Sequence, residues 1–202
     1  MKKLLIVNDL YHETKLHNNI LDILFNHKRE ISDRFRDIKG IHFIDHVAII
    51  IINPIYEITI FSYIPSVEYN LIVKDLWKHD KSFNPTLLKD GAMMWWDEAY
   101  YPGYSKKIQY IKEDFHNFSL GMNLIRKIED YTFVYSFATR SKEKNMKAYY
   151  ADIKNELFHI GDYGYNIIRD IYSRYCAPYI APLLDTDKIL KQKPHLKLIV
   201  NN

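Results

Sequence analysis

The residues best suited to binding chemistry are concentrated in one aromatic-rich segment, residues 77 to 101, with one further candidate at residue 136. Ligand pockets are mostly apolar and aromatic, with a few placed polar groups that orient the bound molecule. Here the aromatic side chains would form the wall and the polar ones would supply hydrogen bonds. The same aromatic residues would serve equally as packing between a sheet and its helices, and the pattern leaves both interpretations open. The predicted ligand-binding residues are Trp77, Asp80, Asn84, Trp95, Trp96, Tyr100 and Ser136.

The histidines do not have the spacing of a metal site. His42 and His46 flank Asp45, but residues four apart on a predicted strand lie about two pleats from each other. The His-Glu-x-x-His spacing that brings two imidazoles onto one ion from a helix is absent from the sequence. His79 and His116 have no recognisable ligand partner nearby. We therefore predict no metal site.

Signatures of catalysis are also missing. The sequence has no Gly-x-Ser-x-Gly elbow, no glycine-rich phosphate loop and only six glycines in 202 residues. The single cysteine, Cys176, lies at the end of an amphipathic helical pattern, where a half-buried structural thiol is expected. We predict no enzymatic activity and no cofactor, although an enzyme without a recognised motif remains a third possibility.

Composition indicates one folded domain. Apolar residues make up 48% of the chain, which is ample for a hydrophobic core at this length. The net charge of +3 is too small to indicate a nucleic-acid binder, and one cysteine suits a reducing compartment. The apolar run of residues 1–7 stops at Asn8, too early for a signal peptide or a membrane span. We expect a cytoplasmic domain over residues 1–182, with a short basic tail over 183–202 and no membrane association.

Hydrophobic periodicity predicts the order of the elements. Two β-rich segments around the turn Asn53-Pro54 should pair as an antiparallel hairpin, and two more flank the turn at residues 128–130. Helices are expected over residues 9–37, 67–77, 106–114 and 144–175, and strands over 42–52, 56–63, 120–127 and 131–138. This order predicts an α/β (α+β) fold, an α-β-α sandwich around a central antiparallel sheet.

The segment Phe118-Ser119-Leu120-Gly121, followed by a hairpin and a long helix, is typical of PAS- or GAF-like sensory domains. From residue 10 to about residue 175 the chain resembles the autoinducer-binding domain of LuxR-type quorum-sensing regulators. Family landmarks are matched by Asn84-Pro85, by Trp95 or Trp96, by residues 118–121 and by the strand at 131–139. The resemblance implies a sensor that encloses a small molecule between a sheet and helices.

The chain departs from the family pattern at identifiable positions. Asn84 stands where the family has an aspartate that accepts the ligand amide N–H, and Ser136 matches the hydroxyl on the last strand. The tryptophan and tyrosine that the family spaces four apart on the preceding helix are absent; Tyr69 and Trp77 are nearby with a different spacing. After Pro182 only 20 residues follow, too few for a helix-turn-helix reader, so direct DNA binding is not expected.

Two functions remain in competition. The first is a non-enzymatic signalling module that binds a small amphipathic signal molecule and forms a homodimer, or a heterodimer with a related regulator. The tyrosines of the last helix, such as Tyr163, Tyr172 and Tyr175, would be interface anchors. The second is a protein-interaction module on a PAS-like scaffold whose pocket has collapsed. A sensor predicts an open pocket, whereas an interaction module predicts a filled interior and an exposed apolar patch.

Overall fold

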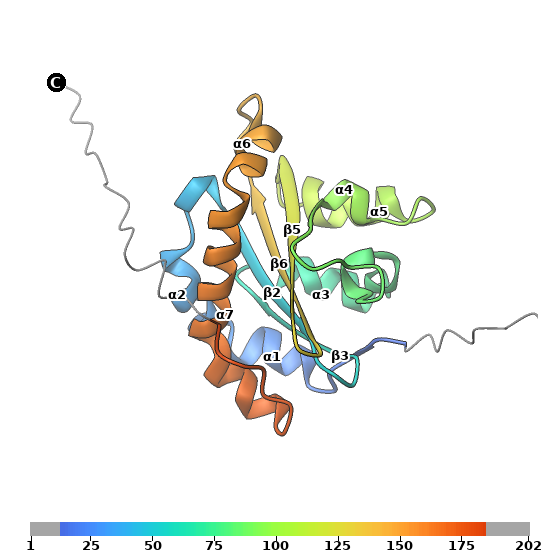
Figure 1. Ribbon diagram of the computed structural model, residues 1–202. Helices are drawn as coiled ribbons and strands as arrows, with labels where there is room; N and C mark the ends of the chain where they lie inside the picture. Colours follow the sequence, from blue (N-terminus) through green and yellow to red (C-terminus); the bar gives the residue numbers. More distant parts are fainter. Residues whose placement is uncertain (1–12, 185–202) are drawn as a thin grey trace, which may run out of the picture.

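The computed structural model describes residues 13–184 (Figure 1). Its elements are β1 (Lys15–Leu16), α1 (Ile20–Asn26), α2 (Lys28–Arg34), β2 (His46–Ile52), β3 (Glu57–Ser62), α3 (Ser66–Val73), β4 (Met93–Trp95), α4 (Trp96–Ala99), α5 (Ser105–Gln109), β5 (Leu120–Ile128), β6 (Tyr131–Thr139), α6 (Met146–Asp152) and α7 (Lys154–Cys176). Short 3-10 turns lie at Phe35–Asp37, Ile41–Phe43, Trp77–His79 and Lys81–Phe83, and a π-helical turn lies at Tyr110–Asp114. Apart from residues 183 and 184, the predicted basic tail is outside the described residues.

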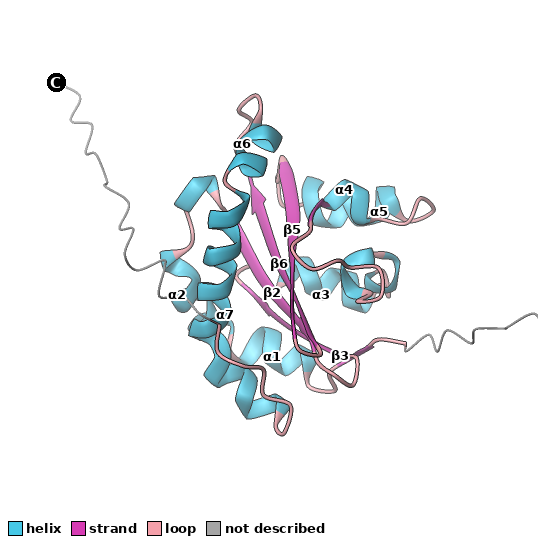
Figure 2. Cartoon of the chain, in the orientation of Figure 1, coloured by secondary structure: helices cyan, strands magenta, loops and turns pink. Residues whose placement is uncertain are grey.

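One six-stranded sheet forms the centre, with strand order β1-β3-β2-β6-β5-β4. All neighbouring strands are antiparallel except β1 and β3, which pair in parallel. Figures 1 and 2 show α7 and α2 on one face of the sheet and α3, α4 and α5 on the other. The predicted α-β-α sandwich and the predicted hairpins β2–β3 and β5–β6 are therefore confirmed.

The central strands are buried on both faces, so their sequences read as nearly continuous apolar runs. Every residue of β2 and of β6 is buried. Side chains of one parity meet α7 and those of the other parity meet the α3–α5 layer, which gives two separate cores. Helix α1 packs against β3 and contributes to both cores, through Ile23 on one side and Leu24 on the other.

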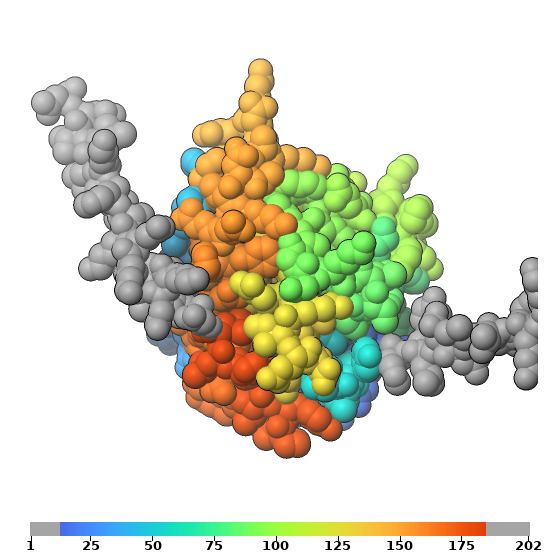
Figure 3. Space-filling model, viewed as in Figure 1, coloured from blue at the N-terminus to red at the C-terminus, as the bar shows by residue number. Residues whose placement is uncertain are grey.

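Helix α7 packs closely on the sheet because two glycines face it. A Cβ on Gly161 would lie 2.0 Å from the ring of Tyr135, so only glycine permits this contact. The Tyr135 hydroxyl donates to Asp162 Oδ1 (2.7 Å), and Arg126 Nε donates to the same oxygen (3.1 Å). Close packing therefore offsets the helix-propensity cost of a glycine in mid-helix, about 1 kcal/mol. Figure 3 shows α7, in orange to red, beside the yellow turn of the β5–β6 hairpin.

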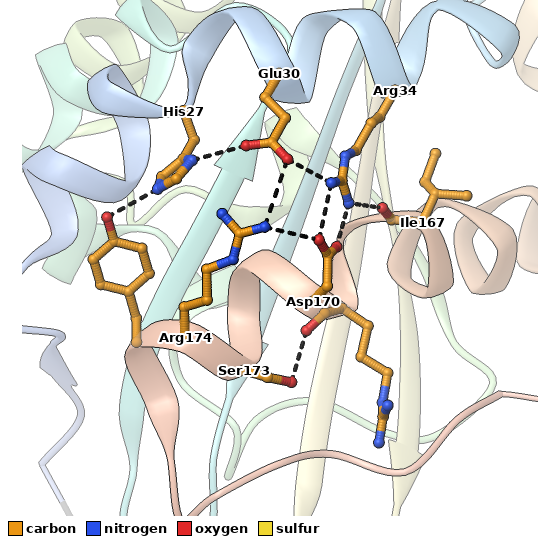
Figure 4. Close-up of polar contacts among 9 residues, drawn as sticks. His27, Glu30, Arg34, Ile167, Asp170, Ser173 and Arg174 are labelled. Atoms are coloured by element: carbon orange, nitrogen blue, oxygen red, sulfur yellow. Dashed lines mark hydrogen bonds and ion pairs between the residues drawn. The ribbon is translucent and has the colours of Figure 1, made fainter.

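A charged cluster fastens α2 to α7 (Figure 4). Arg34 donates to both carboxylate oxygens of Asp170, to Glu30 and to the carbonyl of Ile167. Arg174 also reaches Asp170, at 3.1 Å. The hydrogen bond from Arg34 lowers the pKa of Asp170, and that from His27 lowers the pKa of Glu30. Both carboxylates are thus held in their charged form by neighbours on two helices.

Several element predictions were wrong in detail. The single helix expected over residues 9–37 is, within the described residues, a short strand, two helices and a 3-10 turn, because His27 and the residues before α1 interrupt it. The helix expected over 144–175 is broken at Ile153 into α6 and α7. His42 lies in a 3-10 turn with φ +49°, not on a strand, so the strand argument about His42 and His46 does not hold. Within residues 13–184, none of the helices combines the length and apolar character that crossing a bilayer requires.

Candidate functional site

On the face that meets the α3–α5 layer, small and polar side chains cross the sheet in register. Antiparallel pairing places these positions opposite one another, so their side chains form rows on one face. The first row is Ser62, Ala48, Ser136 and Asn123, and the next is His46, Ala138 and Gly121. Isoleucine and valine side chains flank the rows on β2, β5 and β6. The rows therefore leave room above the sheet, and larger groups from the helical layer occupy it.

Trp96 is the largest group that enters this space. Its side chain is 1% exposed, and its indole covers Gly121, where a Cβ atom would lie 2.0 Å from Cδ2 of the ring. The indole Nε1 donates to Asn123 Oδ1 (3.1 Å) and to Ser136 Oγ (3.0 Å). Two of the predicted ligand-binding residues, Trp96 and Ser136, are thus in direct contact.

A buried ion pair lies beside this indole. Asp80 Oδ2 accepts from Lys112 Nζ at 3.0 Å, and the two side chains are at most 6% exposed. Asp80 Oδ1 accepts from the backbone N–H (2.9 Å) and the hydroxyl (2.6 Å) of Ser82. Lys112 Nζ also lies 4.2 Å from the centroid of the Trp96 ring. A buried charge pair persists only when further hydrogen bonds and aromatic faces complete its surroundings, as they do here.

Asn123 joins the ion pair to the indole. Its Nδ2 donates to Ser82 Oγ at 2.6 Å while its Oδ1 accepts from Trp96. We call this group the Asp80 network. Each carboxylate oxygen of Asp80 accepts a hydrogen bond from within this network, so the buried carboxylate needs no further donor. Its members are Asp80, Ser82, Trp96, Lys112, Asn123 and Ser136.

Tyr100 closes one side of the Asp80 network. Its ring centroid lies 5.3 Å from Lys112 Nζ, and its hydroxyl donates to Glu113 Oε1 at 3.0 Å. Burial, with the charge of Glu113 next in importance, raises the pKa of Tyr100 well above its usual range. Burial likewise raises the pKa of Glu113. Tyr100 is therefore a neutral hydrogen-bond donor throughout the physiological range.

A hollow of about 360 Å³ opens next to Asp80. Trp77 and Phe83 contribute aromatic rings, which meet edge to face at 6.1 Å. Asn84 lies on the rim, where its Oδ1 accepts from the backbone N–H (3.1 Å) and hydroxyl (2.7 Å) of Thr86. Its carbonyl is thus engaged in a local turn. The lining residues are Glu13, Thr14, Trp77, Lys78, Asp80, Phe83 and Asn84.

Six of the seven predicted ligand-binding residues lie on this side of the sheet, and one does not. Trp77, Asp80 and Asn84 line the hollow, and Trp96, Tyr100 and Ser136 lie in or against the Asp80 network. Trp95 is on β4 and packs into the core on the α7 face, with Lys147 Nζ 5.3 Å from its ring. Trp95 pairs with Met122, whose side chain belongs to the same core on the α7 face, whereas Trp96 begins helix α4 on the other side of the sheet.

Sequence reasoning missed Lys112, Ser82 and Asn123. Lys112 follows Ile108 by four residues and so occupies an apolar helical position, a pattern that signals a buried charge in need of a partner. The π-helical turn that carries Lys112 is itself a feature found often at functional sites.

The described part of the chain holds no group of three or more His, Cys, Asp or Glu side chains arranged to bind a metal ion.

Comparison with known proteins gives a structural likeness and no sequence match: no family model and no curated relative matches the chain. A crystal structure of Escherichia coli SdiA in the space group P6522 aligns with a TM-score of 0.53 and 12% identity, covering 75% of this chain and 64% of that chain. A structure of SdiA in complex with octanoyl-rac-glycerol aligns with a TM-score of 0.51 and 10% identity, covering 77% and 63%.

The chain spans slightly less than two thirds of the SdiA chains that it matches. At identities of 10% and 12% this likeness concerns the fold, while function is carried by particular sites. The fold implied by Asn84-Pro85, residues 118–121 and the closing helix is therefore confirmed. The chain shares its fold with SdiA, a LuxR-type autoinducer-binding regulator.

Proposed function

We propose that the chain is a non-enzymatic, small-molecule-sensing module that holds its ligand in the hollow beside Asp80, on the side of the sheet that faces the α3–α5 layer. The observation that carries the proposal is the hollow of about 360 Å³, which is lined by aromatic rings and leads to the buried carboxylate of Asp80. Aromatic walls with a few converging polar groups are the usual composition of a small-molecule site. Trp77, Asp80 and Asn84, predicted from sequence as ligand contacts, line this hollow.

The chemistry of the surroundings favours an amphipathic ligand. Trp77 and Phe83 belong to the apolar core on this side of the sheet and also line the hollow, so an apolar chain would contact their rings. The polar side chains lie on one level of the sheet, in the rows that contain Ser136 and Asn123. A similar fold binds octanoyl-rac-glycerol in SdiA, a molecule that joins an apolar chain to a hydroxylated head.

A protein-interaction module is the second candidate, favoured by one surface feature. Four large apolar side chains are 36–52% exposed on α1 and α3, and Phe25 and Tyr69 meet edge to face at 5.2 Å. Exposed apolar clusters of this kind mark interaction surfaces more often than isolated residues do. Trp96 also fills the space above Gly121, as a collapsed pocket would require. The four side chains are Leu21, Phe25, Tyr69 and Val73.

Native mass spectrometry of the chain purified from a cell extract, compared with the same sample after denaturation, separates these candidates. A discrete small molecule that is lost on denaturation supports the sensor and gives the ligand mass. A bare chain that is dimeric supports the interaction module, with a second copy or a related regulator as the partner. A bare monomer that also fails to bind amphiphiles added in vitro would contradict the sensor.

A further inference from the structure

A second group of buried polar side chains lies on the same face of the sheet as the Asp80 network but is separate from it. His46 on β2 and Glu68 on α3 are 0% and 5% exposed, and His46 Nε2 lies 3.2 Å from Glu68 Oε1. Ser62 on β3 is 0% exposed and is opposite Ala48, which makes it a diagonal cross-strand neighbour of His46, roughly 7–8 Å away between Cα atoms. We call His46, Ser62 and Glu68 the His46 centre.

The His46 centre has unused hydrogen-bonding capacity, in contrast to the Asp80 network. Among the described residues, His46 Nδ1, Glu68 Oε2 and Ser62 Oγ are buried and have no hydrogen-bond partner. The ring of Phe118 lies beside both His46 and His116, and His116 Nε2 is also buried without a hydrogen-bond partner. Buried polar atoms are nearly always satisfied in folded proteins, so several unpaired atoms in one place indicate that a further molecule, an ordered water or a ligand group, completes them.

The chemistry of these atoms restricts what that molecule is. A carboxylate oxygen only accepts, so Glu68 Oε2 requires a donor. His46 Nε2 donates to Glu68 Oε1, which leaves Nδ1 as the acceptor of a neutral imidazole, while Ser62 Oγ donates or accepts. An anionic head group would be repelled by Glu68. A hydroxyl group donates one hydrogen bond and also accepts, so two hydroxyl groups can donate to Glu68 Oε2 and His46 Nδ1 and exchange a hydrogen bond with Ser62 Oγ. The rings of Phe118 and Trp96, 5.5 and 6.3 Å from the His46 ring between centroids, would contact the apolar remainder.

We propose that the His46 centre recognises the hydroxylated head of a neutral amphiphile, with Glu68 and Ser62 as the residues that determine specificity. This inference rests on the proposed sensor function and names the class of its ligand. The Asp80 network, whose hydrogen bonds are already made, then positions Trp96 beside the head group. The His46 centre supplies the contacts that distinguish a hydroxylated ligand from an ester or an acid of the same chain length.

The test measures binding of three probes to the full chain by calorimetry: 1-octanoylglycerol, methyl octanoate and octanoate. We expect 1-octanoylglycerol to bind most tightly. Glu68→Gln removes a charged acceptor and should weaken its binding about 10- to 100-fold, and Ser62→Ala should weaken it about 10-fold. Binding of methyl octanoate should change less than about twofold in both variants. Glu143→Gln, at an exposed position, is the matched control and should leave all three affinities unchanged.

Thermal unfolding without ligand separates recognition from a structural role. Because Ser62 Oγ has no partner in the protein, Ser62→Ala should not lower the unfolding temperature. Glu68→Gln keeps an oxygen that accepts from His46 Nε2 but loses the charge of a buried pair, so its unfolding temperature is compared with its affinity rather than expected to be unchanged. A lowered unfolding temperature together with unchanged affinity for 1-octanoylglycerol would assign these residues to folding and overturn the inference. Equal affinity of the wild-type chain for 1-octanoylglycerol and methyl octanoate would also overturn it.

Native mass spectrometry distinguishes failure of the sensor function from failure of the assignment to the His46 centre. If native mass spectrometry finds a bound molecule that is an acid or lacks hydroxyl groups, the sensor function stands and the assignment to the His46 centre fails. If the chain is bare and none of the three probes binds, both the sensor function and this assignment fail. A bound neutral molecule with hydroxyl groups, retained by Glu143→Gln and lost from Glu68→Gln, supports both.

Discussion

The indole ring of Trp96 lies on the backbone of Gly121, where a Cβ atom would fall 2.0 Å from Cδ2 of the ring. The ring has no room to retreat, because its Nε1 is held by Asn123 and Ser136 and its face is covered by Lys112. One missing side chain on β5 therefore determines where the largest residue of the site lies. The position of the Asp80 network follows from the same contact.

Replacing Gly121 by alanine should destabilise the fold. The added methyl group would force the indole out of its place, and overpacking of a filled core typically costs about 1–3 kcal/mol. Urea unfolding measures the loss. Gly103→Ala is the matched control, because nothing lies within 4 Å of a Cβ at that position, and it should be neutral or slightly stabilising. Equal stability of the two variants would contradict the close contact between Gly121 and Trp96.

Removing Lys112 should be more damaging than removing any exposed lysine. Lys112→Met leaves the Asp80 carboxylate buried without its cation, and breaking a buried pair costs about 3–5 kcal/mol. Urea unfolding of Lys106→Met, at an exposed position on α5, should change the free energy of unfolding by less than about 0.5 kcal/mol. The double variant Lys112→Met/Asp80→Asn should recover part of the loss. No recovery would mean that Lys112 contributes through packing alone.

The two tryptophans at positions 95 and 96 should differ sharply in ligand binding. Trp96→Phe removes an N–H that serves two acceptors of the site, so we expect affinity for the ligand to fall about 10-fold. Trp95→Phe changes a residue on the opposite face of the sheet and should alter affinity less than twofold. Calorimetry with 1-octanoylglycerol measures both. Similar losses in the two variants would place the ligand elsewhere.

Acid should weaken the link between α2 and α7. The pKa values of Glu30 and Asp170 are lowered from ordinary values of 4.5 and 3.8 by hydrogen bonds from His27 and Arg34 respectively. Their contribution is therefore present above those ordinary values and is lost as the pH falls through the lowered ones. Because these groups are partly exposed, the effect should be small. Urea unfolding between pH 3 and 7 should show a shallower acid loss for Arg34→Met than for the wild-type chain.

Cys176 should be unreactive in the folded protein. The thiol is 3% exposed, and burial raises its pKa to about 12, so the nucleophilic thiolate is almost absent at neutral pH. Labelling with a chromogenic disulfide should proceed only as fast as the chain unfolds, and should be rapid in concentrated urea. Fast labelling without denaturant would show that the end of α7 opens.

Long-range pairing was predictable where local signals were strong. The β2–β3 and β5–β6 hairpins follow from apolar runs around turn residues, and the sandwich follows from their order. The break at Ile153 was not predictable, because residues on both sides of it continue the apolar stripe of a helix. The parallel pair β1–β3 is only two residues long and depends on the tertiary fold.

The types of residue that form the candidate site were predictable from the sequence, but the face of the sheet on which each one lies was not. The aromatic segment and Ser136 indicated where polar and aromatic groups would gather, and six of the seven residues do lie on one side of the sheet. Trp95 was assigned with them because the sequence contains no mark of where β4 ends and α4 begins. Lys112 and the His46 centre required the structure, because their partners are distant in sequence.

The contact between Trp96 and Gly121 also makes the protein a candidate for chemical complementation. Trp96→Ala would remove the indole and leave a cavity above Gly121, which has no side chain to fill it. Two acceptors in that cavity, Asn123 Oδ1 and Ser136 Oγ, would lose the ring N–H that they now bind. Free indole has the shape and the donor to refill that cavity. The Trp96→Ala variant should therefore regain thermal stability when indole is added.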